Sequence, residues 1–125
     1  MAIGAIAVVY HYQHGDKTAA LHGLDNDEEL LLAMIAAFLD EAPVQLAELE
    51  QAQALGDLTA LANAAHSLKG ALSYLRAERA RDCAAQLESA ARHNSTVDYQ
   101  QLSQALTLET KQIMTVLQQF LTDNT

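Results

Sequence analysis

The sequence predicts an all-α protein, an antiparallel four-helix bundle in up-down-up-down order with a short additional N-terminal helix. Half of its 125 residues are hydrophobic and only 5% are aromatic, and most of the hydrophobic ones are the strong helix formers Ala and Leu. There is one proline, and only Gly56 and Gly70 follow residue 23. Short connections between apolar-striped segments favour antiparallel neighbours. The length fits one domain, expected over residues 18–125, with residues 1–17 as a linker or packed extension.

The first 27 residues carry weak helical signals. Residues 1–17 have no clean period, and Thr18 to Leu21 predict a short helix ending at Gly23. The opening MAIGAIAVV is apolar for only nine residues, too few to span a bilayer, and no Lys or Arg precedes it as in a signal peptide. We therefore expect a cytoplasmic location without direct membrane insertion.

A long helix is predicted next. Asp25 to Asp27 offer capping oxygens at its start, and Gly56 marks its end, with Asp57 as the cap of the following helix. Pro43 should kink this helix or divide it in two. Its apolar stripe is Leu31, Ile35, Phe38, Ala42, Leu46 and Leu49.

Three more helices follow by the same criterion. One runs from about Leu58 to Leu75, and its inward stripe is Leu58, Leu61, Ala65, Leu68, Leu72 and Leu75. The next is striped by Ala80, Cys83, Ala84, Leu87 and Ala91. The segment HNST then interrupts the helical pattern, with Ser95 or Thr96 as the cap of the next helix. The last runs from about Val97 to Leu121, with Leu102, Leu106, Ile113, Leu117 and Phe120 inward.

Charge and motif content exclude several functions. A formal charge of −9 argues against binding to nucleic acid or to an anionic membrane surface. The single cysteine, Cys83, lies on an apolar stripe and is expected in the core. No glycine-rich nucleotide loop, no evident acid–base carboxylate pair and no Glu-x-x-His pair of a di-metal bundle is present. We expect no metal site and no ATP site, so the chain should not phosphorylate itself.

The stretch AHSLKG, residues 65–70, places a histidine outside the apolar stripe. At 100° per residue, His66 falls about 140° from Leu61, the centre of that stripe. Lys69 and Gly70, at i+3 and i+4, share its surface. A glycine inside a helix costs about 0.5–1 kcal/mol relative to alanine, and no turn is needed at Gly70. Its missing Cβ leaves the helix surface bare, so a bulky group can approach the imidazole.

A carboxylate is predicted beside this histidine. His66 and Glu88 are 22 positions apart, so a hairpin turning near Arg76–Ala77 sets the two side chains level. Glu88 could then accept a hydrogen bond from the Nδ1–H of His66, which leaves the Nε2 lone pair as a nucleophile. Five of the seven basic residues lie in this hairpin, which favours a phosphoryl group on a partner protein as the electrophile: Lys69, Arg76, Arg79, Arg81 and Arg92.

The stretch AHSLKGA, followed by CAAQLE, resembles the histidine-containing phosphotransfer (HPt) domains of bacterial phosphorelays. The family pattern is His-x-x-Lys-Gly, then Leu-Glu or a glutamine equivalent on the second helix. The resemblance covers about residues 20–122 and includes the helical lead-in FLDEAPVQLAELEQAQALGDLTALANAAHSLKG.

The resemblance implies that His66 is phosphorylated, Lys69 steadies the phosphoryl group, Gly70 admits the partner and Glu88 orients the imidazole. The phosphoryl group would arrive from the aspartate of one receiver domain of a response regulator and leave to another. The receiver would supply the magnesium ion, and this domain would need no cofactor of its own. A monomer would suffice.

Two positions depart from the family. Arg76 stands where the family often has a glycine at the helix turn, and Leu72 is larger than the residue often found there. We expect Leu72 to enlarge an apolar docking patch, and Ser73 and Arg76 to join Gly70 in binding the partner.

The sequence leaves the wider setting open. The first hypothesis is a phosphocarrier, free-standing or the C-terminal domain of a hybrid sensor histidine kinase. The alternatives are a non-catalytic helical adaptor and the phosphoacceptor domain of a chemotaxis-type histidine kinase. Whether the protein counts as an enzyme, as part of such a phosphotransferase, depends on which applies.

Overall fold

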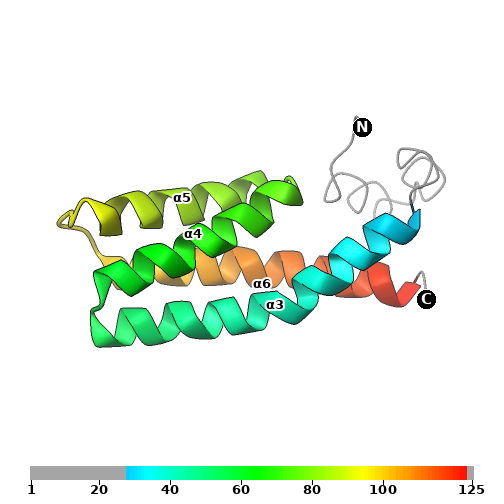
Figure 1. Ribbon diagram of the computed structural model, residues 1–125, viewed down its shortest axis with the longest axis horizontal. Coiled ribbons are helices and arrows are strands. Elements are labelled where there is room, and N and C mark those ends of the chain that lie inside the picture. The colour runs from blue at the N-terminus through cyan, green and yellow to red at the C-terminus, as the bar shows by residue number, and fades with distance from the viewer. Residues whose placement is uncertain (1–27, 124–125) are drawn as a thin grey trace.

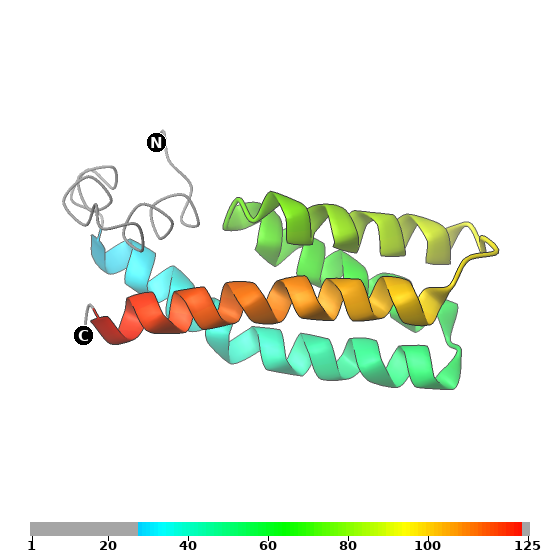
Figure 2. The same cartoon turned by 180° about the vertical axis from the view of Figure 1, so that it is seen from behind.

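The protein folds as an antiparallel bundle of four helices (Figure 1). This computed structural model describes residues 28–123. The helices are α3 (Glu28–Leu55), α4 (Leu58–Tyr74), α5 (Glu78–Arg92) and α6 (Tyr99–Asp123). Both α3 and α5 pack against α4 and against α6, and successive helices run in opposite directions (Figures 1 and 2). No strand occurs among residues 28–123, so the predicted all-α bundle is confirmed. The helix predicted at Thr18–Leu21, like residues 1–17, lies outside the described residues.

The predicted apolar stripes form one core. Leu and Ala dominate it, and the largest fully buried side chains are Ile35, Leu49, Leu61, Leu68, Leu72, Leu75, Leu87, Leu106, Leu117 and Phe120. Cys83 is a partial exception, because it is only half-buried against this core. Burial, reinforced by the neighbouring Glu109 carboxylate, raises the pKa of the Cys83 thiol. This shift favours the protonated thiol, which is a poor nucleophile.

The helix α3 continues through its proline. Pro43 lies inside α3, which remains one helix rather than two and changes direction near its middle (Figure 1). Proline lacks the N–H that would bond the carbonyl four residues earlier and its ring crowds that carbonyl, which accounts for the bend.

The helix α3 is also unusually apolar. By length and composition alone, its span Glu29–Leu55 is sufficient to cross a membrane. The core helix of a bundle meets the same criterion, and α3 supplies Leu31, Ile35 and Phe38 to the buried core.

Three helix ends close with the same backbone motif. The residue after the C-cap has a positive φ: 68° at Gly56, 59° at Arg76 and 51° at Asn94. At each end the following amide bonds back to a carbonyl five residues earlier, as in Ala77 N–H to the Leu72 carbonyl at 3.0 Å. This is the Schellman arrangement, for which glycine is the usual residue. The turn near Arg76–Ala77 is therefore confirmed, and it forms without glycine.

The starts of α4 and α6 are capped by aspartates. Asp57 accepts from the Ala60 amide at 3.0 Å, as predicted. At the start of α6, Asp98 accepts from the Gln101 amide at 3.0 Å, so the expected cap at Ser95 or Thr96 is wrong. The Tyr99 hydroxyl donates to the Ser95 carbonyl at 2.6 Å, which ties the segment before α6 to the first residue of that helix.

The strained turn at Arg76 can be tested by stability. Replacing Arg76 with glycine should stabilise the fold by about 1 kcal/mol relative to Arg76→Ala, because only glycine adopts this φ without a Cβ clash. Urea denaturation of the two variants measures the difference. Equal stabilities would show that this turn carries no conformational strain.

Candidate functional site

The His66 imidazole projects from the middle of α4 into solvent. Its side chain is 62% exposed, whereas Leu68, two residues on, is 0% exposed. The orientation predicted from the helical stripe is thus confirmed. The ring lies beside α5, whose Glu88 comes level with it across the α4–α5 hairpin.

Glu88 contacts the imidazole directly. The Nδ1 atom of His66 lies 2.9 Å from Oε2 of Glu88, which is the contact predicted from the hairpin register. An ionised carboxylate accepts hydrogen bonds and cannot donate them. The hydrogen-bond network therefore assigns the imidazole proton to Nδ1. The neutral ring then carries its lone pair on Nε2, the nitrogen away from Glu88. The pair presents an oriented nucleophile at the surface of the bundle.

Two cations hold the Glu88 carboxylate. Lys69 Nζ lies 2.7 Å from Oε1, and Arg92 Nε donates to Oε2 at 3.2 Å. The contact with the Lys69 ammonium is the main cause that keeps the pKa of Glu88 below its ordinary value of 4.5; burial opposes this shift, and Arg92 and the charge of Lys69 add to it. The Glu88 side chain is only 12% exposed, yet it stays ionised because both its oxygens have partners.

This geometry changes the expected place of Lys69. The resemblance implies an ammonium group directed at the phosphoryl site, whereas in the structure Lys69 is paired with Glu88. Its side chain remains 34% exposed and sits one helical turn from His66. Its role at a phosphoryl group stays a prediction, and its partner in the structure is Glu88.

Arg92 and Asn63 join the cluster, although neither was predicted as a site residue. In the sequence, Arg92 is one of five basic residues in the predicted hairpin. Its Nη2 donates to Oδ1 of Asn63 on α4 at 3.4 Å, so it links both helices of the hairpin. A sequence signal existed, because Arg92 is four residues after Glu88 and Asn63 is three before His66, spacings that share a helix face.

Of the residues predicted to bind the partner, some are exposed to solvent and one is buried. A Cβ added at Gly70 meets nothing within 4 Å, so the surface beside His66 is bare as expected. The Ser73 hydroxyl donates to the Lys69 carbonyl at 2.7 Å, and Arg76 is exposed at the end of the hairpin. Leu72 is 0% exposed, so its expected role in a docking patch is wrong: it belongs to the inward stripe of α4. The exposed apolar side chain at this end of α4 is Tyr74.

Part of the basic neighbourhood is neutralised. Arg79 pairs with Glu109 of α6 at 3.1 Å, and Arg81 pairs with Asp82 at 2.8 Å. The cations that contact the His66 and Glu88 pair are therefore Lys69 and Arg92, rather than the whole basic set of the hairpin.

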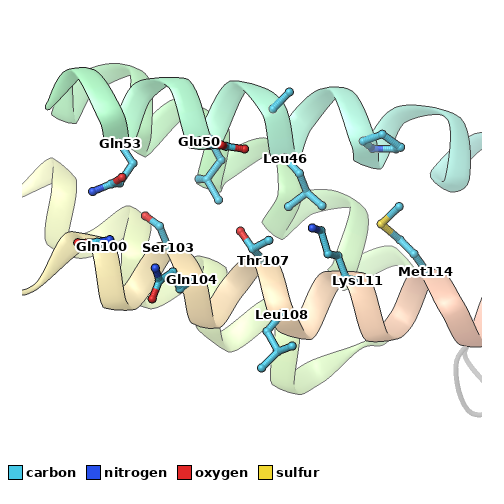
Figure 3. Close-up of a pocket in the computed structure, with 13 residues that line it drawn as sticks. Leu46, Glu50, Gln53, Gln100, Ser103, Gln104, Thr107, Leu108, Lys111 and Met114 are labelled. Carbon is cyan, nitrogen blue, oxygen red and sulfur yellow. The ribbon is translucent and has the colours of Figure 1, made fainter.

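A groove with a volume of about 670 Å³ runs between α3 and α6 (Figure 3). Leu46 of α3 and Ser103 and Thr107 of α6 point into it, and Glu50 and Lys111 also line it. The helices α3 and α6 form the opposite pair of the bundle from α4 and α5. The groove is consequently separate from the His66 surface and holds neither a histidine nor a cysteine in its lining.

The ion cluster predicts a pH-dependent stability. Because the folded-state pKa of Glu88 lies below 4.5, the cluster's contribution is complete above that pH and is lost as pH falls through the folded-state pKa. The free energy of unfolding of the wild type, relative to Glu88→Gln, should therefore decline between neutral pH and acid below 4.5. Urea denaturation across this range measures it, with Glu41→Gln, at an exposed α3 position, as control. A constant difference would rule out the linkage.

Comparison with known proteins places this site in a family. The family model described as the Hpt domain matches residues 33–122, which is most of the chain. No curated protein and no solved structure matches significantly. Hpt domains carry out histidine phosphotransfer in phosphorelays, where they interact with receiver domains. The match includes all of α4, α5 and the His66 cluster, and on that extent this chain belongs to the Hpt domain family.

Proposed function

We propose that His66 is the phosphoacceptor, taking a phosphoryl group from a receiver-domain aspartate and passing it to another receiver. The observation that carries the proposal is the exposed imidazole whose Nδ1 is engaged by Glu88 at 2.9 Å, which leaves Nε2 as the nucleophile. In the forward step the P–O bond of the aspartyl phosphate breaks, a P–Nε2 bond forms and the aspartate carboxylate is released. The Nδ1 proton remains, so the ring becomes cationic next to the Glu88 carboxylate.

The two partners divide the chemistry. This chain supplies the nucleophile, its orientation and an open approach beside Gly70. The receiver supplies the aspartate and the magnesium ion that offsets charge on the transferring phosphoryl group, and in this proposal the domain needs no cofactor of its own. The receivers include that of a hybrid sensor kinase in this proposal. A monomer suffices, because one α4–α5 hairpin contributes the whole cluster.

Incubation with a panel of phosphorylated receivers tests the acceptor. The wild type should become labelled, and His66→Gln should abolish labelling without unfolding the bundle, because the His66 side chain is exposed. His93→Gln is the matched control, since it removes an exposed histidine that follows α5 outside the cluster and should leave labelling unchanged. Labelling of His66→Gln at the wild-type rate would refute the site. A fully folded wild type that no receiver labels would favour the adaptor alternative.

Access at Gly70 predicts a dependence on donor size. Gly70→Leu should fold, because a Cβ there meets open space, but it should slow transfer from a receiver by about tenfold or more through steric exclusion. Labelling by phosphoramidate, a small phosphoryl donor, should change by less than about twofold. Circular dichroism checks the fold. Equal slowing with both donors would mean that Gly70 affects the imidazole rather than the approach of the partner.

A further inference from the structure

The carboxylate of Glu88 creates an electrostatic conflict at the proposed acceptor. It favours the cationic ring that forms when Nε2 is phosphorylated, but it also repels the incoming anionic phosphoryl group. The two groups are separated by only an imidazole ring. A carboxylate that is 12% exposed interacts with its neighbours more strongly than one in open solvent. Compensating cations are therefore needed on the protein side of the ring.

The two available cations contact different oxygens. Lys69 Nζ binds Oε1, whereas Arg92 Nε binds Oε2, the oxygen that also accepts from His66. Lys69 can therefore leave Oε1 without disturbing the Oε2 contacts. If Arg92 were absent, departure of Lys69 would leave a largely buried carboxylate with the imidazole alone, which is costly.

The surroundings of Arg92 favour a fixed role. Two nitrogens of its guanidinium group are engaged: Nε contacts Glu88 on its own helix, and Nη2 donates to Asn63 on α4. Lys69 has a flexible four-carbon stem and, among residues 28–123, a single ion-pair partner. Exposed i,i+4 ion pairs are worth little, but this pair includes the nearly buried Glu88.

We infer that Arg92 is a positioning residue that neutralises Glu88, so that Lys69 is free to exchange from Oε1 to the phosphoryl group. The inference rests on the proposed function of His66. It further implies that Arg92 is required because residue 88 is a charged glutamate, and that a neutral glutamine there would remove most of the requirement.

The test measures phosphorylation of His66 by phosphoramidate in the wild type and in variants of Arg92 and Glu88. This donor transfers its phosphoryl group to Nε2 and releases ammonia, so no receiver needs to be identified. Arg92→Ala should slow labelling by about tenfold. In the Glu88→Gln background, the same Arg92→Ala change should alter the rate by less than about twofold. Arg92→Lys, which keeps the charge, should restore most of the wild-type rate.

Arg81→Ala is a closely matched control. Arg81 and Arg92 are both on α5, with side chains that are 43% and 44% exposed, but Arg81 pairs with Asp82 outside the cluster. Its removal lowers the net charge equally and should leave the rate unchanged. If Arg81→Ala slowed labelling as much as Arg92→Ala, the effect would come from the net charge of the protein, and the inference would be overturned.

The double variant separates an action through Glu88 from other roles. Equal slowing by Arg92→Ala in the wild-type and Glu88→Gln backgrounds would overturn the inference, because Arg92 would then act directly on the phosphoryl group or only on the fold.

The ¹⁵N chemical shifts of the His66 ring provide an independent readout: Arg92→Ala should move the Nδ1 resonance downfield, because an unneutralised Glu88 carboxylate is a stronger acceptor for the Nδ1 proton, and an unchanged shift would count against neutralisation by Arg92. If phosphoramidate labels His66 but no receiver does, the receiver function fails while this charge coupling is still measured.

Discussion

The almost buried Glu88 carboxylate is the constraint on which the site depends. It accepts a hydrogen bond from Nδ1 of His66 and forms an ion pair with Lys69, both on α4. It forms a second ion pair with Arg92 of its own helix. A charge so shielded from water needs compensating cations beside it. The helices α4 and α5 must consequently keep one relative register, and in that register the imidazole has a single tautomer with its nucleophilic nitrogen outward.

The register is set by the turn that joins the two helices. Leu75 and Ala77 are buried on either side of Arg76, so the chain is anchored in the core as it reverses. A Schellman closure then lets Arg76 take a left-handed conformation. Gly56 and Asn94 have the same left-handed conformation at the ends of α3 and α5, so three helices end in the same backbone conformation. The burial of its flanking residues offsets the strain of placing an arginine there.

The core and the site occupy different faces of the same helix. Leu68 and Leu72 of α4 are 0% exposed and fix the rotation of the helix, while His66 and Gly70 lie on its outer face. Because the interior is close-packed, that rotation has little freedom. The histidine therefore does not rely on a flexible loop for its orientation. The longer helices α3 and α6 provide the opposite side of the bundle and its separate groove.

Four helices, the stripes that face the core, the outward side of His66 and the placement of Glu88 beside it could be predicted from the order of residues. These features follow from the helical period and from counting along a hairpin, both of which are local properties. Three other features emerge only from the packed helices: Lys69 pairs with Glu88, Arg92 and Asn63 complete the cluster, and Leu72 is buried and offers no docking surface. Ion pairing depends on where the ends of long side chains meet across two helices, and burial depends on the neighbours that cover a residue. A linear pattern contains neither quantity, because both arise only when the helices pack.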